Sequence, residues 1–205
     1  MTATGMNHGM KRSLALLAML PVLLAVRVVD AGDADFKSGV FDPPSAAPDF
    51  QLQGSNGAPI VLSKFRGRVV AIAFGFTYCE RICPVTLANL SAAFKKLGPA
   101  AADVQVIFVS VDPDRDSPDR LREYLQSFNP SFLGATGNKG QIDAVRQAYG
   151  VFAQRAVAEN KKGGYEAHHS SSIFLIDREG KLRVLVPFGR SSQAILNDVS
   201  LLLKR

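Results

Sequence analysis

The chain has 205 residues, of which 47% are hydrophobic, so it is long enough for one globular domain of ordinary size plus an appendage. Its formal net charge is +6. The positive residues are scattered and have no aromatic residues interleaved with them. The composition therefore argues against a nucleic-acid partner and leaves an acidic protein partner open.

The N-terminal region has the pattern of an export signal. Basic residues at 11–12 precede an apolar run at 13–26, and residues 29–31 (VDA) offer small side chains at a cleavage position. The apolar run is shorter than the roughly 20 residues that span a bilayer, and Arg27 interrupts it. These features favour a cleaved signal over a permanent membrane anchor.

We therefore predict that residues 1–31 are a signal peptide or an N-terminal membrane anchor, with any membrane association made through residues 13–29. The protein would be exported to the periplasm, as a soluble domain or attached to the inner membrane.

Residues 32–48 are polar and rich in Gly, Asp and Pro, which predicts a linker, and the globular domain is expected at 49–205. The domain opens with a predicted hairpin, because Asn56-Gly57 forms a strong turn between the short strands 50–52 and 59–62.

A βαβ unit is predicted next. The apolar run 69–76 is too short for a helix and suits a strand buried on both faces. A helix begins near Pro84 and closes at Gly98, and residues 104–111 form a second buried strand. Two such strands joined by a helix pair in parallel, with a right-handed crossover.

The rest of the chain completes a thioredoxin-like plan. The pattern predicts one helix that starts at Ser117-Pro118 and a second helix around 142–150. A mobile polar loop at 154–165, a hairpin at 172–186 and a closing helix at 195–203 follow. We therefore predict an α/β protein of thioredoxin-like fold, with a central mixed sheet flanked by helices and an N-terminal hairpin. In this plan the reactive cysteines lie at the first βα turn.

Both cysteines of the chain, Cys79 and Cys83, fall at that turn. A purely structural disulfide is a weak explanation, because closing so small a loop contributes only roughly 2 kcal/mol. Cys83 precedes Pro84, so it is expected at a helix N-terminus, where the helix dipole stabilises a thiolate. A redox dithiol and a metal-binding pair both remain open, since both need an activated thiol.

The available ligands favour copper among metals. Structural zinc takes four protein ligands, whereas beyond the N-terminal segment the chain adds only His168 and His169 to the two cysteines. Two thiolates and one imidazole suit Cu(I), a soft ion. Neighbouring residues entering a strand face opposite ways, so only one of the two histidines is expected to reach the cysteines, and exposed histidines without a ligand role are the alternative.

Three segments together resemble the Sco/SenC family of thioredoxin-like copper proteins: FGFTYCERICPVTL (74–87), SVDPDRDSP (110–118) and HHSSSIFLIDREG (168–180). The resemblance extends from about Pro48 to the C-terminus. It implies a copper chaperone that delivers copper to, or maintains the thiols of, the binuclear copper site of cytochrome c oxidase. The implied partner is the copper-bearing subunit of that enzyme.

By this resemblance, Cys79 and Cys83 are the copper-binding and redox-active disulfide pair, and His169 is the third ligand of Cu(I) or Cu(II). His168 departs from the family, which usually has Asp at this position, so it could assist or compete with His169. Glu80-Arg81 also departs from the common Pro-Asp between the cysteines.

The alternative is an enzyme that uses the dithiol without metal, either a thiol-disulfide oxidoreductase or a peroxidase. Oxidoreductases of this fold usually carry Cys-x-x-Cys, and the extra residue here suits a metal better. A peroxidase needs a positioned Thr and Arg, but Thr77 and Arg81 do not have the usual spacing. A redox or copper sensor is a third possibility.

A partial calcium-loop pattern lies at Asp112, Asp114, Asp116 and Glu123. The required Gly is replaced by Ser117, and Pro118 disrupts the remainder, so a turn followed by helix capping from Asp116 or Ser117 is the better interpretation.

Overall fold

The computed structural model describes residues 1–2, 35–157, 165–169 and 171–205. The chain divides into two compact units, 1–30 and 31–205, and the fold below is that of the second. Within the described residues, no helix has the length and apolar character needed to cross a membrane, and the apolar run at 13–26 lies outside them. The signal or anchor therefore stays a prediction.

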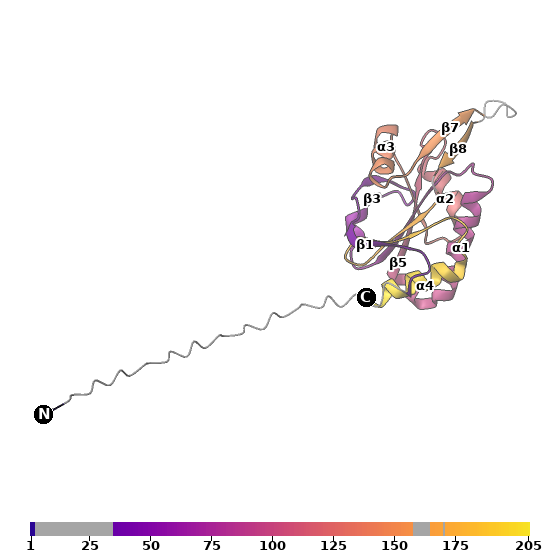
Figure 1. Ribbon diagram of the computed structural model, residues 1–205. Helices are drawn as coiled ribbons and strands as arrows, with labels where there is room; N and C mark the ends of the chain where they lie inside the picture. Colours follow the sequence, from indigo (N-terminus) through magenta and orange to yellow (C-terminus); the bar gives the residue numbers. More distant parts are fainter. Residues whose placement is uncertain (3–34, 158–164, 170) are drawn as a thin grey trace. The chain divides into compact units, whose positions relative to one another are not determined.

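An eight-stranded mixed sheet forms the centre of the domain, in the order β1-β10-β9-β4-β5-β6-β2-β3 (Figure 1). The neighbours β4, β5 and β6 run parallel, and the other pairs are antiparallel. The strands are β1 (Gly39–Ala46), β2 (Gln51–Gly54), β3 (Pro59–Val61), β4 (Val69–Gly75), β5 (Val104–Ser110), β6 (Leu133–Thr136), β9 (Ile173–Ile176) and β10 (Lys181–Val186). A separate two-stranded ladder joins β7 (Ala153–Val157) to β8 (Tyr165–His169).

Helices cover both faces of this sheet. They are α1 (Ile82–Leu97), α2 (Pro118–Gln126), α3 (Lys139–Ala148) and α4 (Ser192–Leu203), with short 3₁₀ turns at Leu62–Phe65 and Gly98–Asp103. All seven residues of β4 are buried, and they alternate between two hydrophobic cores. One core packs under α1, α2 and α4, and the other packs under α3 (Figure 1). The prediction of a strand buried on both faces is confirmed.

Most of the predicted plan is confirmed, including the α/β class, the N-terminal hairpin and the parallel pairing of β4 with β5. Local signals act as expected. The Ser117 side chain accepts a hydrogen bond from the backbone N–H of Arg120 and caps α2. Gly98 follows α1 with a φ of 57°, a left-handed conformation that suits glycine.

The linker prediction is wrong for residues 39–46, which form β1 at the edge of the sheet. The pairing with β10 uses Gly39 and Val40 and then Ser45 and Ala46, with an irregularity between the two parts. Pro43 and Pro44 fall in this interruption, where their missing N–H groups break no ladder bond. An edge strand can therefore hold a Pro-rich sequence that reads as a linker.

Two further segments were mispredicted. Strand β6 was missed because it is short and contains Gly134, where a Cβ would lie 2.6 Å from Leu121 of α2. The mobile loop expected at 154–165 is wrong at both of its ends, since β7 and β8 pair from Ala153–His169 to Val157–Tyr165. That ladder is made by backbone pairing and has no alternating apolar pattern in the sequence.

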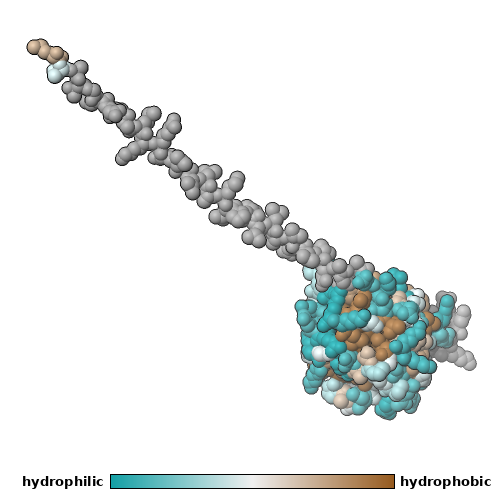
Figure 2. Space-filling view, turned by 90° about the horizontal axis from the view of Figure 1, so that it is seen from below, coloured by the Kyte–Doolittle hydropathy of each residue, from teal (hydrophilic) through white to brown (hydrophobic). Residues whose placement is uncertain are grey.

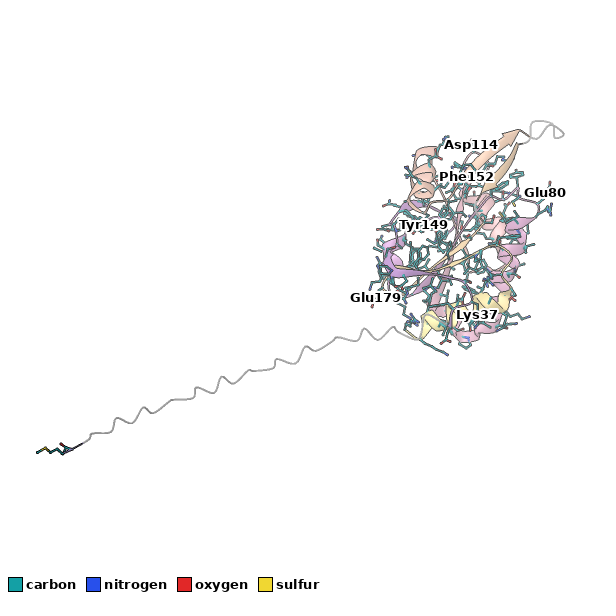
Figure 3. All side chains as sticks on the ribbon, viewed as in Figure 1. Lys37, Glu80, Asp114, Tyr149, Phe152 and Glu179 are labelled. Atoms are coloured by element: carbon teal, nitrogen blue, oxygen red, sulfur yellow. The ribbon has the colours of Figure 1, made fainter. Side chains whose placement is uncertain are left out.

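The two ends of the sheet carry different loops. Figure 3 places Glu80 and Asp114, which follow β4 and β5, at the upper end, and Glu179, in the turn between β9 and β10, at the lower end. Figure 2 views the molecule from this lower end. We call the upper end the dithiol end, because both cysteines lie there.

Candidate metal centre

The two cysteines lie at the junction between β4 and α1, as predicted. The backbone N–H of Cys79 donates a 3.2 Å hydrogen bond to the carbonyl of Phe76, which turns the chain after the strand. Cys83 lies in the first turn of α1 and is only 2% exposed, whereas Cys79 is half-buried. Both are thiols. Cys79 is therefore the more accessible sulfur atom.

The first turn of α1 directs a backbone amide at Cys79. The N–H of Cys83 donates to the Sγ of Cys79 over 3.4 Å. The pKa of Cys83 is raised strongly by its side-chain hydrogen bond with Cys79, by burial and by the nearby charge of Cys79. The expectation that the helix N-terminus stabilises a Cys83 thiolate is therefore wrong: Cys83 keeps its proton, and the helix amide supports the sulfur of Cys79.

Gly75 gives Cys83 its position. A Cβ at residue 75 would lie 2.7 Å from the Sγ of Cys83 and 2.6 Å from the ring of Phe108. The thiol thus packs directly on the backbone of β4, and only glycine leaves room for it.

A buried carboxylate supports the loop that carries Cys79. Asp116 is 0% exposed and accepts 2.7 Å hydrogen bonds from the hydroxyls of Thr77 and Ser110, together with the backbone N–H of Thr77. Burial raises the pKa of Asp116 despite these hydrogen bonds, which act to lower it. The carboxylate therefore links the end of β5 to the residue two positions before Cys79.

Two arginines hold an exposed aromatic ring beside Cys79. The guanidinium carbons of Arg115 and Arg120 lie 4.8 and 5.4 Å from the ring centroid of Tyr78, which is 53% exposed. Arg115 also pairs with the buried Asp112, and Arg120 donates from Nε to the Thr77 hydroxyl over 3.2 Å. The loop before Cys79 is thus held by Asp116 through Thr77 and by the two arginines through Tyr78.

Sequence reasoning missed this supporting set: Ser110, Asp112, Asp116, Arg115 and Arg120 were not given a role at the dithiol. A signal was present. The carboxyl ends of neighbouring parallel strands meet at one edge of a sheet, so the polar block after β5 must lie beside the loop after β4.

The backbone of His168 and His169 lies in β8, where it pairs with Gln154 and Ala153. The two histidines therefore lie at the end of β8, several residues before β9 begins. The expectation that they begin the strand at 172–176 is wrong. The histidine side chains lie outside the described part of the structure. Among the described side chains, no group of three His, Cys, Asp or Glu could hold a metal ion.

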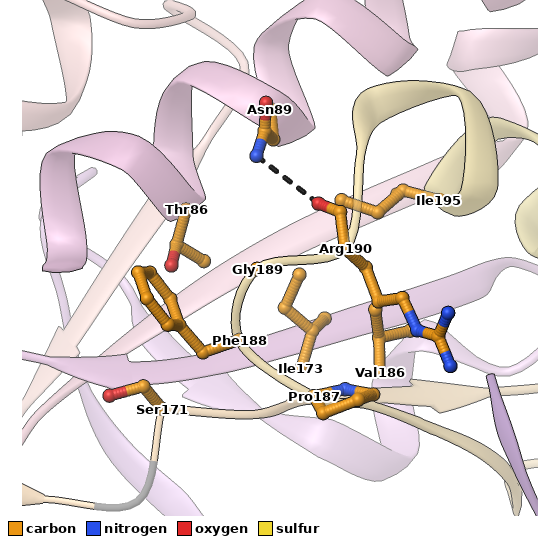
Figure 4. A pocket seen from close by; sticks show the side chains of 10 residues that line it. All are labelled: Thr86, Asn89, Ser171, Ile173, Val186, Pro187, Phe188, Gly189, Arg190 and Ile195. Atoms are coloured by element: carbon orange, nitrogen blue, oxygen red, sulfur yellow. Dashed lines mark hydrogen bonds between the residues drawn. The ribbon is translucent and has the colours of Figure 1, made fainter.

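The chain that follows His169 returns to α1. A shallow pocket is lined by Cys83 together with Ser171 and Ser172. A neighbouring shallow pocket is lined by Thr86, Ser171 and Phe188, among others (Figure 4). Figure 4 also shows the hydrogen bond of 3.2 Å from the Asn89 side chain to the carbonyl of Arg190, which ties the loop after β10 to α1.

Comparison with known proteins identifies the family. The SCO1/SenC family model matches residues 41–204. The chain belongs to this family. Its thioredoxin-like fold agrees with that assignment, and the resemblance expected from the three sequence segments is confirmed.

A SCO2-like protein of Rickettsia conorii is 38% identical over 133 residues, which cover 65% of each of the two chains, so this chain matches about two thirds of that relative's length. The structure of Bradyrhizobium japonicum ScoI with copper bound is 32% identical, with a TM-score of 0.70 over 77% of this chain and 99% of that one. BsSco, described as a cytochrome c oxidase assembly protein with a disulfide switch, is 25% identical, with a TM-score of 0.62 over 79% of this chain and 95% of that one.

Proposed function

We propose that this protein is a copper chaperone that holds copper through Cys79, Cys83 and His169. It would deliver the copper to, or maintain the thiols of, the binuclear copper site of cytochrome c oxidase, and its partner would be the copper-bearing subunit of that enzyme. The arrangement of the dithiol carries this proposal: a half-buried thiol in the loop before α1 lies against a buried thiol in the first turn of α1, and the sulfur of Cys79 accepts the Cys83 amide.

The donor chemistry fits copper as cargo. Two adjacent thiols offer soft sulfur ligands that suit Cu(I), and a third ligand from His169 would complete a low-coordinate site. Support for His169 comes from the pocket that Cys83 shares with Ser171 and Ser172, since this brings the chain two residues after His169 to the dithiol. His168 would be directed away from the copper, because neighbouring residues of a strand face opposite ways.

Anaerobic titration of the reduced full-length protein with Cu(I), in the presence of a competing chelator, tests the proposal. We expect one copper per chain, with a large loss of affinity in Cys79→Ser and Cys83→Ser and a smaller loss in His169→Ala. His168→Ala is the matched control and should bind as the wild type does. Equal affinity of Cys83→Ser and the wild type would show that the proposed site is wrong.

A thiol-disulfide exchange function is the second candidate, because Cys79 is accessible while Cys83 keeps its proton beside it. In such a reaction Cys79 would attack a disulfide, and Cys83 would then resolve the mixed disulfide. Rapid reduction of insulin disulfides by the copper-free protein, with no copper bound on purification, would favour this function over copper delivery.

We also propose that the protein works in the periplasm, with residues 1–31 acting as its signal or as its anchor in the inner membrane. The basic residues and apolar run of that segment support export. Cell fractionation followed by N-terminal sequencing of the mature protein distinguishes cleavage from anchoring.

A further inference from the structure

The end of the domain opposite the dithiol is strongly basic. We call it the basic end and define it by four segments: the turn before β4 (66–68), the end of α1 with the 3₁₀ turn after it (95–103), the turn between β9 and β10 (177–181), and the C-terminal residues 204–205. These segments hold eight basic residues, namely Arg66, Arg68, Lys95, Lys96, Arg178, Lys181, Lys204 and Arg205, and three acidic ones, namely Asp103, Asp177 and Glu179.

Hydrogen bonds join three of these segments to one another and to the last residue of α4. The guanidinium of Arg178 donates to the carbonyl of Gly67, to the carboxylate of Asp103 and to the carbonyl of Leu203, at 3.3, 3.1 and 3.4 Å. Arg68 donates to the carbonyl of Val104 over 2.7 Å. The basic residues at 66–68, 177–181 and 204–205 therefore lie close together at this end of the sheet.

This surface also has an apolar centre. Figure 2, which views the domain from the lower end, shows hydrophobic residues in the middle of the face and hydrophilic residues around them. Four apolar residues of the last turns of α1 and α4 and of the 3₁₀ turn are only half-buried: Leu97, Ala101, Leu201 and Leu203. A basic rim around an apolar centre suits the interface of an anionic bilayer, which offers negative headgroups above acyl chains.

The chain enters the domain beside this surface. The ring of Phe36 lies 5.0 Å from the guanidinium carbon of Arg205, and the side chain of Asn197 donates to the carbonyl of Asp35 over 3.0 Å. The apolar run at 13–26 ends nine residues before Asp35. Nine residues span at most about 30 Å, so a bilayer that held this run would keep the start of the domain within about that distance.

We propose that the basic end rests on an anionic membrane surface. The dithiol then faces away from the bilayer, because it lies at the other end of β4, a strand whose seven residues extend about 23 Å. This orientation presents Cys79 at a fixed height above the membrane. The proposal does not depend on copper binding, so the two proposals can fail independently.

The test uses the full-length protein with two kinds of vesicle, pure phosphatidylcholine and a 7:3 mixture of phosphatidylcholine with phosphatidylglycerol. The apolar stretch can bind both, but only the mixture offers negative charge. We expect the mixture alone to slow backbone hydrogen exchange in residues 95–103 and 177–181, and added salt to reverse this effect. Exchange in the loop around Tyr78 should stay unchanged, because that loop lies at the dithiol end.

Two triple variants with the same loss of charge locate the effect. Lys95→Gln, Lys96→Gln and Lys204→Gln remove exposed charges from the basic end, and we expect the preference for the anionic vesicles to fall roughly a hundredfold, at about fivefold per residue. The control, Arg122→Gln, Lys139→Gln and Arg190→Gln, removes three exposed charges elsewhere and should keep the preference.

Three outcomes would overturn the proposal: equal protection by both kinds of vesicle, an equal loss of preference in the two triple variants, or protection by soluble polyglutamate but not by the anionic vesicles. The last of these would assign the basic end to an acidic protein. Each result is read from lipid binding and hydrogen exchange, so none is affected by the metal content of the protein.

Discussion

The dithiol end and the basic end close the same sheet in different ways. At the dithiol end, side chains hold the loop after β4 in place: they are a buried carboxylate, a buried thiol and an aromatic ring between two arginines. At the basic end, one arginine ties backbone carbonyls and a carboxylate from three segments together. The contacts at the dithiol end position the two thiols, whereas those at the basic end hold backbone segments together.

Charge distinguishes the two ends as well. The described loops of the dithiol end, at 76–81, 111–117, 171–172 and 187–191, hold three basic and four acidic residues, whereas the basic end holds eight and three. Two of the acidic residues at the dithiol end, Asp112 and Asp116, are 0% exposed. Burying such groups costs free energy, and this cost is typical of sites that place chemical groups for function. The four predictions below test this contrast between the two ends.

The largest expected effect is the pH dependence of Cu(I) affinity. The raised pKa of Cys83 means that this thiol is protonated across the physiological range, so copper bound at Cys83 as proposed would have to displace its proton. Affinity should therefore rise with pH, by about tenfold per pH unit for this one proton, and fall as pH decreases. Chelator competition between about pH 6 and pH 8 measures the slope. Cys83→Ser should lower the slope by one proton, and an unchanged slope would show that Cys83 does not bind the metal.

Gly75→Ala should come next in size. The added Cβ meets the Sγ of Cys83 and the ring of Phe108 at less than 3 Å, so both neighbours or the backbone of β4 must shift. Overpacking of this kind costs about 1–3 kcal/mol of unfolding free energy, and the displaced thiol should also weaken Cu(I) binding. Denaturant unfolding and copper titration measure the two effects. Gly39→Ala is the control, because its Cβ meets only a carbonyl oxygen at 3.5 Å; similar losses in both variants would contradict the explanation.

Arg178→Ala should affect the basic end without affecting the dithiol end. It removes the three hydrogen bonds that join segments of the basic end, which predicts a loss of about 1–2 kcal/mol in unfolding free energy. Cu(I) affinity should stay at the wild-type value, because the dithiol lies at the other end of the sheet. A change in copper affinity comparable to that of Gly75→Ala would mean that the two ends are coupled through β4.

The sequence predicted the framework well where local patterns repeat over several residues. The run at β4, the apolar face of α1 and the Ser117 cap each leave a signal that needs no knowledge of the rest of the fold. The missed elements lack such signals. Strand β1 contains two prolines at a sheet edge, and the pairing of β7 with β8 depends on backbone groups that the sequence does not encode by residue type.

The position of the two cysteines between β4 and α1 was predicted, but their electrostatics were not. Both cysteines stood out by their rarity and by their place before a helix. The protonation of Cys83 depends on its burial over Gly75 and on its contact with Cys79, which are three-dimensional facts. A helix N-terminus stabilises a thiolate only where the sulfur meets the amides, and here the sulfur that receives an amide is that of Cys79.

The smallest expected effect concerns the buried Asp116. Burial raises its pKa, so the folded protein binds the proton more tightly than the unfolded chain does. The stability that wild type gains relative to Asp116→Asn is therefore greatest below the unfolded pKa of the carboxyl and declines as pH rises through the folded pKa, by about 1.4 kcal/mol for each unit of the shift. Urea unfolding of both proteins from about pH 4 to pH 7 measures this difference.

Asp49 provides a control of opposite sign at an exposed position. Burial acts to raise its pKa, but hydrogen bonds from Ser63 and Phe50 prevail and lower it. Its contribution to stability should accordingly be present above the unfolded pKa and decrease as the pH falls through the folded one. The differences in unfolding free energy between wild type and the two variants, Asp116→Asn and Asp49→Asn, should therefore change with pH in opposite directions. A change in the same direction would mean that burial does not control the pKa of Asp116, and the two ends of the domain would then not differ in their electrostatics as argued above.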